Sequence, residues 1–140
     1  MAKIKNISLT DFRNFNSLKI AFEKKSNIFF GKNGSGKTNL LEAISLISKG
    51  RGLRNGQFKN LININKKKFE IESALEINKN YYDIKIFTDY NETNYKKIIL
   101  INENNSKENL DFLNSSISFL FFLPEMERLF QSSPTNRRNF

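Results

Sequence analysis

The spacing of apolar positions predicts strands at the start of the chain. Residues 4–9 (IKNISL) and 18–22 (LKIAF) alternate apolar and polar side chains, and residues 27–30 (NIFF) form a short apolar run before a glycine. A period of two places every second side chain on one face of a strand. The pattern therefore predicts three strands, the last of which leads straight into a glycine-rich segment.

Helical spacing follows this segment. Leu40, Leu41, Ile44 and Ile47 predict a helix with one apolar face, and Gly50 stands where a glycine commonly ends a helix. The next stretch, KGRGLRNGQ, has three glycines and two arginines without periodicity, which predicts a loop.

The second half begins with three more alternating segments. Residues 69–77, 81–87 and 95–101 are separated by the turn sequences NKN and DYNETN, which predicts an antiparallel meander. Residues 106–116 then predict a short helix with Ser106 as its N-cap.

The last part of the chain predicts one strand and two helical pieces. Residues 117–123 (ISFLFFL) form an apolar run that we expect to be a buried strand, with Phe119–Phe122 in the core. Residues 124–130 predict a helical turn, and Ser133 before Pro134 is typical of a helix start. We expect that last helix to be begun and not finished.

Composition excludes several kinds of chemistry. The chain has 140 residues, about one ordinary domain, with no cysteine and no histidine. This excludes disulfides, thiolate metal sites and Ser/His or Cys/His catalysis. The longest apolar run is too short to cross a bilayer, and the N-terminus lacks the pattern of a secretory signal. We therefore expect a soluble, cytoplasmic protein that has no membrane partner.

Charge is distributed unevenly along the chain. The formal net charge is +9, and residues 1–68 carry 15 Lys and Arg against 3 Asp and Glu, while residues 69–140 carry 8 against 11. A basic half would suit a polyanion, because lysine and arginine neutralise phosphates and release condensed counterions. An AT-rich genome would also supply lysines without selection for binding.

The glycine-rich segment contains the strongest motif, G-x-x-x-x-G-K-[ST], between a predicted strand and a predicted helix. Its eight residues are Gly31, Lys32, Asn33, Gly34, Ser35, Gly36, Lys37 and Thr38. The glycines let successive N–H groups point inward at the positive end of the helix. A polyphosphate would fit there: Lys37 would reach its β and γ phosphates, and the Thr38 hydroxyl would bind Mg²⁺. The motif predicts a phosphate-binding site for a nucleotide and Mg²⁺.

Three further segments surround this loop. They are LTDFRNF (residues 9–15), GRGLR (50–54) and PEMERLFQSSPTNRRNF (124–140). Together with the loop they closely resemble the N-terminal part of the RecF family, and the resemblance covers essentially the whole chain. Ser132 stands where we expect a glycine in that family, and we expect the family motif to run on past Phe140 into an aspartate.

The resemblance implies an α/β fold, the P-loop NTPase head of the ABC and SMC type. We expect only its N-terminal part, with an antiparallel β subdomain, truncated before the later parallel strands. Within one ATP-binding head over 1–140, residues 1–60 would hold strands, the P-loop and the first helix. Residues 61–103 would form the antiparallel meander, and residues 104–140 would start an incomplete helical lobe.

The resemblance also implies an ATP-binding, DNA-binding protein of recombinational repair, replication and the SOS response to DNA damage. Such a protein forms a homodimer over nucleotide and binds single- and double-stranded DNA at gaps and junctions. With its partners RecR and RecO it helps to load RecA at single-strand gaps, and it is a weak DNA-dependent ATPase.

Four residues outside the loop are candidate contacts to nucleotide or DNA. Arg13 and Asn14 lie between two phenylalanines, and Arg51 and Arg54 lie in the loop after the predicted helix. The alternative is structural: Arg13 would cap a strand end with its stem over aromatic surface, and the other two arginines would be solvated loop charges. The sequence leaves both interpretations open.

Hydrolysis requires residues that the chain lacks. An aspartate at the end of an apolar strand must brace Mg²⁺, but residues 98–103 have Asn102 there and residues 119–125 run into Pro124. The glycine-pair signature that completes ABC-type sites across a dimer is also absent, since no glycine follows Gly56. We expect no catalytic residue and no ATP turnover in this chain alone.

Three hypotheses follow from the sequence. The first is a RecF-like chain that holds the phosphate cradle without the hydrolytic residues. The second is a self-contained small P-loop NTPase or kinase, whose catalytic carboxylate would be Glu42 or Glu125. The third is a non-functional remnant of a split gene, because residues 27–30 would lack the parallel neighbours that cover such a strand.

Overall fold

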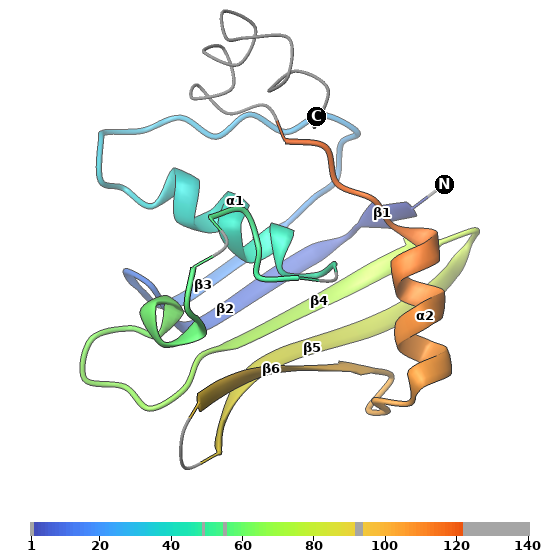
Figure 1. Cartoon of the computed structure of the whole chain (residues 1–140). Helices are drawn as coiled ribbons and strands as arrows, with labels where there is room; N and C mark the ends of the chain where they lie inside the picture. The colour runs from blue at the N-terminus through green and yellow to red at the C-terminus, as the bar shows by residue number, and fades with distance from the viewer. Residues whose placement is uncertain (1, 49, 55, 92–93, 122–140) are drawn as a thin grey trace, which may run out of the picture.

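The computed structural model describes residues 2–48, 50–54, 56–91 and 94–121 (Figure 1). The strands are β1 (Ala2–Ile4), β2 (Asn6–Phe12), β3 (Phe15–Ala21), β4 (Glu70–Ile77), β5 (Asn80–Asn91) and β6 (Asn94–Ile101). The helices are α1 (Lys37–Ser45), the 3-10 helix η1 (Phe58–Leu61) and α2 (Lys107–Ser116).

The described strands form one antiparallel sheet. Its order is β3-β2-β4-β5-β6, and β1 also pairs with β4. The predicted meander is confirmed, because β4 pairs antiparallel with β5 and β5 pairs antiparallel with β6. The sheet is continuous from the strands that precede the glycine-rich loop to those that follow it.

β1 and β2 lie end to end along β4, with a bulge between them. Ile4 faces Leu75 and Ser8 faces Glu72, so four steps on one side match three on the other. One extra residue in a ladder is a β-bulge. Asn6 stabilises it, since its Oδ1 accepts the N–H of Ala74 at 3.0 Å. The single strand predicted over residues 4–9 is therefore two strands.

The core lies on one face of this sheet. α1 contributes the buried Leu40 and Ala43, and α2 contributes the buried Leu113. Phe112 of α2 is 38% exposed and lies over the sheet, with its ring centre 5.1 Å from that of Tyr82. Figure 1 shows both helices packed beside the sheet. The opposite face carries charged side chains, and Lys85 forms ion pairs there with two glutamates of β4 at 3.0 and 3.4 Å.

Residues 27–30, predicted as a strand, do not form one. Ile28 and Phe30 are 88% and 91% exposed, and Phe29 makes an edge-to-face contact with Phe22 at 6.3 Å. A strand needs a hydrogen-bonded neighbour, and no described strand of this chain pairs with the segment. The prediction of a strand is wrong, whereas the expected exposure of its apolar side chains is confirmed.

α1 ends earlier than the sequence predicted. It stops at Ser45 and not near Gly50. The N–H groups of Leu46 and Ile47 donate to the carbonyl oxygens of Ala43 and Ile44, three residues back, as in a 3-10 turn. Leu41, predicted on the apolar face, is 41% exposed, and Leu46 is fully buried instead.

Residues 117–121 do not form the predicted buried strand either. Leu120 is 71% exposed, while Phe119 packs against the core and stacks on Phe121 with ring centres 5.8 Å apart. The helical turn predicted over 124–130 and the helix start at Ser133 lie outside the described residues. The helix predicted over 106–116 is confirmed, with Ser106 as its cap. Within the described part of the chain, no helix is long and apolar enough to cross a membrane.

Candidate nucleotide-binding site

The glycine-rich loop runs directly into α1. Gly36 is the N-cap of this helix, with φ of 100°, and its carbonyl accepts the N–H of Leu40 at 2.9 Å. No side chain caps the helix, and its first turn contains no acidic residue. The N–H groups of the first turn therefore have no side-chain partner, and the positive end of the helix dipole is uncompensated.

The turn between β2 and β3 forms one wall of the loop. Phe12 pairs with Phe15, so Arg13 and Asn14 make a two-residue turn, and Arg13 has a φ of 52°. A Cβ at Gly36 would collide with the Phe15 ring and lie 2.9 Å from Asn14 Nδ2. Only glycine fits here, because the left-handed backbone and the close wall both exclude a side chain.

Lys37 folds back over the loop that precedes it. Its Nζ donates hydrogen bonds to the carbonyl oxygens of Gly31 at 2.7 Å and Lys32 at 2.9 Å. Thr38 is exposed in the first turn of the helix. The loop thus brings an ammonium group, a hydroxyl and the end of a helix to one place.

Arg13 forms a bidentate ion pair with Glu42 of α1. Its Nε and one terminal nitrogen donate to the two carboxylate oxygens, both at 2.9 Å, and the Glu42 side chain is only 1% exposed. Arg54 approaches the same carboxylate at 3.4 Å and is 45% exposed. One buried carboxylate therefore pairs with two guanidinium groups.

Amide contacts extend this cluster toward the loop. Asn39, two positions after Lys37, donates to Asn14 Oδ1 at 2.8 Å and accepts from Arg54 at 3.2 Å. Three of the four residues predicted outside the motif, Arg13, Asn14 and Arg54, thus surround the first half of α1. Arg51 does not join them and lies beside β5 and β6.

The loop after α1 is packed so that Arg54 returns to the helix. The N–H of Leu53 donates to Ser45 Oγ at 2.7 Å, and a Cβ at Gly52 would come within 2.8 Å of Leu46 Cδ2. At the far end of α1, Lys97 of β6 donates to the carbonyls of Leu46 at 3.2 Å and Ser48 at 2.8 Å. Burial lowers the pKa of Lys97 to about 8.

Asn102, the residue that we compared with the aspartate of a hydrolytic site, forms hydrogen bonds with the main chain. It follows β6, and its Oδ1 accepts the N–H of Asp83 at 2.9 Å while its own N–H donates to the Asp83 carbonyl at 2.8 Å. Its role in the described structure is to end the β5–β6 ladder.

Sequence reasoning missed the roles of Glu42 and Asn39. Glu42 appeared only as a catalytic candidate, although it is the sole acidic residue between Glu23 and Phe69 in a strongly basic stretch. An isolated carboxylate among arginines, beside the apolar residues of a helix, is a signal for a buried ion pair. Asn39 carries no comparable signal in the sequence.

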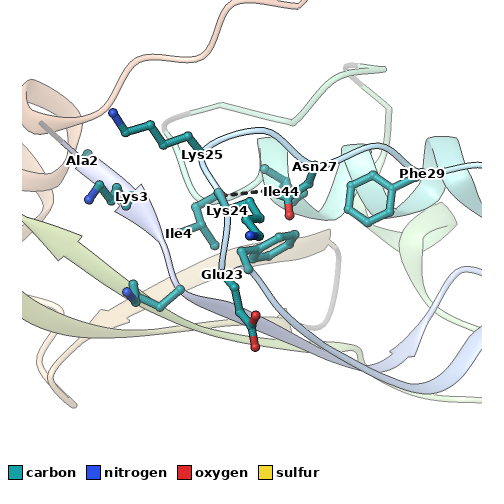
Figure 2. A pocket seen from close by; sticks show the side chains of 11 residues that line it. Ala2, Lys3, Ile4, Glu23, Lys24, Lys25, Asn27, Phe29 and Ile44 are labelled. Carbon is teal, nitrogen blue, oxygen red and sulfur yellow. Dashed lines mark hydrogen bonds between the residues drawn. The ribbon is translucent and has the colours of Figure 1, made fainter.

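A separate cavity lies away from the loop. It has a volume of about 360 Å³ and lies where residues 22–29 pass over β1 and α1 (Figure 2). Lysines and apolar side chains share its lining, among them Lys3, Lys24, Ile4, Phe29 and Ile44. None of the eight motif residues lines it, so it is distinct from the phosphate loop.

The fold is the N-terminal part of a P-loop head of the ABC and SMC type. A family model described as "RecF/RecN/SMC N terminal domain" matches residues 3–120, and the chain belongs to this family.

Curated relatives agree with this assignment. The DNA replication and repair protein RecF of Rhizobium etli is 32% identical over 138 residues, covering 98% of this chain and 37% of the relative. The protein of the same name from Natranaerobius thermophilus is 34% identical, covering 99% of this chain and 35% of the relative. The chain thus spans little more than a third of the length of these relatives.

Solved structures give the same result. Two structures of the recombination mediator protein RecF in the RecFOR pathway, one with ATPrS and one with ATP, match with TM-scores of 0.76 and 0.73 at 27% identity. Each match covers 99% of this chain, and 36% and 37% of the respective solved chain.

Proposed function

We propose that this chain forms the phosphate-binding part of a RecF-like ATPase head that acts in DNA repair and replication. The uncapped N-terminus of α1, with Lys37 folded over the loop, is the observation that carries the proposal. Backbone N–H groups and a helix dipole attract the phosphates of ATP, and Lys37 would leave its two carbonyl partners for the β and γ phosphates.

The cluster around Glu42 supports the same site. Arg13 and Arg54 are held at the first half of α1, and Asn14 is in contact with Asn39 beside the loop. In this proposal Arg54, the more exposed arginine with the longer contact, turns toward nucleotide phosphate, while Arg13 keeps the carboxylate neutralised.

The loop also fits a magnesium ion that arrives with the nucleotide. Mg²⁺ prefers oxygen ligands and keeps several waters, so one protein hydroxyl and the phosphate oxygens suffice. Thr38 is exposed at the first turn and supplies that hydroxyl. When bound, the ion would neutralise phosphate charge, and the chain's own part is to hold the phosphates with Lys37 and the N–H groups.

The larger assembly belongs to the proposal as well. The protein would dimerise over ATP in the cytoplasm and bind single- and double-stranded DNA at gaps and junctions. With RecR and RecO it would take part in RecA loading and the SOS response. The names of the relatives support repair, replication and the RecFOR pathway. The remaining roles are implied by the resemblance to the RecF family.

A self-contained NTPase or kinase is the weaker alternative. Both oxygens of Glu42 accept hydrogen bonds from arginine, which argues against a role in orienting water or a substrate hydroxyl. Glu125 lies outside the described residues. We therefore propose nucleotide binding without turnover by this chain alone.

Calorimetric titration of the 140-residue chain with ATP and Mg²⁺ tests the proposal. We expect measurable binding that Lys37→Ala removes and that Lys19→Ala, at an exposed lysine of β3 outside the loop, retains. Phosphate release should stay at the background rate. Equal ATP binding by wild type and Lys37→Ala would overturn the phosphate site, and robust Mg²⁺-dependent release would support the alternative enzyme.

A further inference from the structure

A groove lies beside the β5–β6 hairpin and remains unused by the nucleotide site. Its volume is about 830 Å³, and it is bounded by the loop after α1, by η1 and by the ends of β5 and β6. Among the described residues that line it, none is acidic. Its cations include Arg51 and the exposed Lys59 and Lys96.

Aromatic rings lie in the same groove. Tyr90 and Tyr95 face each other across the β5–β6 ladder, with ring centres 4.9 Å apart and planes tilted by 45°. Tyr90 is 57% exposed, and Phe58 of η1 lies in the lining as well. Aromatic faces stack on nucleobases, while neighbouring cations follow a phosphate backbone.

This groove and the phosphate loop belong to different ends of α1. The loop joins the N-terminus of the helix, whereas Lys97, in the lining of the groove, binds carbonyls at residues 46 and 48 beyond its C-terminus. A helix of nine residues is roughly 13 Å long. A ligand in the groove therefore leaves the phosphate loop accessible.

We propose that the groove between η1 and the β5–β6 hairpin binds single-stranded DNA, by stacking a base on Tyr90 and Tyr95 and by pairing phosphates with Arg51 and Lys59. The choice of DNA rests on the proposed function, while the choice of a single strand rests on the rings. In a duplex the faces of the bases are covered by their neighbours, so exposed rings at a groove select unpaired bases.

Fluorescence anisotropy of a labelled oligothymidine, titrated with the 140-residue chain, tests the stacking part. We expect Tyr90→Ala to weaken binding by about tenfold, within the range for loss of one base–aromatic stack. Tyr90→Phe keeps the ring and should bind as wild type. Tyr81→Ala is the matched control, because Tyr81 is a 66% exposed tyrosine on the same strand, β5, outside the groove.

The salt dependence of the same titration tests the charged part. We expect Lys59→Gln to lower the slope of log K against log salt by about 0.7, the value for one phosphate contact on a single strand. Lys19→Gln, an exposed lysine of β3 outside the groove, should leave the slope nearly unchanged. Circular dichroism shows whether each variant is folded.

Several results would overturn the proposal. They are the absence of oligothymidine binding, equal affinities of wild type, Tyr90→Ala and Tyr81→Ala, or a duplex that competes as well as the single strand. A single-stranded RNA that binds more tightly would overturn the choice of DNA. Lys37→Ala separates this proposal from the nucleotide site, because the variant should no longer bind ATP but should still bind oligothymidine. If the wild-type chain binds oligothymidine but does not bind ATP, only the proposed function is overturned.

Discussion

The two α-helices begin in opposite ways. α2 starts at Ser106, whose hydroxyl accepts the N–H of Asn109 at 3.2 Å, and Glu108 adds a negative charge in its first turn. α1 starts at Gly36 with neither a cap nor an acidic residue. The N-terminus of α2 is capped by its own chain, as stability favours, whereas the N–H groups at the start of α1 have no side-chain partner. In the proposed function these N–H groups bind phosphate. The N-terminal end of α2 is therefore built for stability, whereas that of α1 lacks the same stabilising contacts.

The same two helices are also anchored differently. α2 packs through apolar contacts such as Leu113 and the Phe112 ring. α1 adds a buried carboxylate, Glu42, whose two arginine partners come from distant parts of the chain. The helix that carries the phosphate loop is thus fixed in position by charge as well as by packing.

Among these variants, Glu42→Ala should lower the unfolding free energy most. It removes the carboxylate that neutralises Arg13 and Arg54, and the loss of one partner of a buried ion pair costs about 3 kcal/mol of unfolding free energy. Urea denaturation measures it. Glu72→Ala, at an exposed pair with Lys85, is the control and should cost under about 0.5 kcal/mol. Similar losses in both variants would contradict the structural role of Glu42.

Gly36→Ala should come next. The added Cβ meets the Phe15 ring in a left-handed backbone, which should destabilise the chain by about 2 kcal/mol and weaken ATP binding. Gly34→Ala is the control for steric contact, since Gly34 is also left-handed but has no atom within 4 Å of the added Cβ. Denaturation and calorimetry of both variants separate the effect of backbone strain from that of the steric clash with Phe15. Equal effects would show that the Phe15 wall is unimportant.

Ser106→Ala sharpens the contrast at the other helix. Loss of the cap should lower the unfolding free energy by about 1 kcal/mol, because the N–H of Asn109 loses its acceptor. ATP binding should stay as in wild type. Ser115→Ala, which removes an exposed hydroxyl at the end of α2, serves as the control. A drop in ATP affinity on loss of the Ser106 cap would argue against independent helix ends.

Lys97, at the C-terminal end of α1, gives an effect on stability that depends on pH. Its pKa is lowered to about 8 by burial, so between pH 8 and its ordinary value of 10.5 the unfolded chain binds a proton that the folded chain has released. Stability should therefore rise with pH across this window. Lys97→Met should lack that rise, as measured by denaturation at several pH values. An unchanged pH slope in the variant would refute the lowered pKa.

Local patterns were sufficient for much of the fold. β4, β5 and β6 follow one another with short turns, and α2 has its cap in the sequence, so each could be predicted from neighbouring residues. Residues 27–30 have an equally apolar pattern but no strand, because pairing depends on a partner that no described part of the chain supplies. Periodicity indicates which face is apolar and does not provide the neighbour.

The site divides in the same way. The motif of residues 31–38 is contiguous in sequence. The contacts of Lys37 with the carbonyls of residues 31 and 32 are therefore local, and the sequence alone places Lys37 beside this loop. The pair of Arg13 and Glu42 joins positions 29 residues apart, and the contact forms only after β2 and α1 have packed together. Sequence reasoning therefore identified Arg13 as a candidate but could not choose between its two interpretations.

The turn at Arg13 and Asn14 also has a kinetic consequence. Hairpins such as β2–β3 and β4–β5 join neighbouring segments and form in about 1–10 μs, whereas β2 and β4 meet only when Thr10 reaches Glu70. The wall beside Gly36 is therefore built early, and the helix is held against it late. We expect amide hydrogen exchange to open the first turns of α1 well before the β4–β5 ladder, so the helix end at Gly36 would become ordered after that ladder and would lose its order before it.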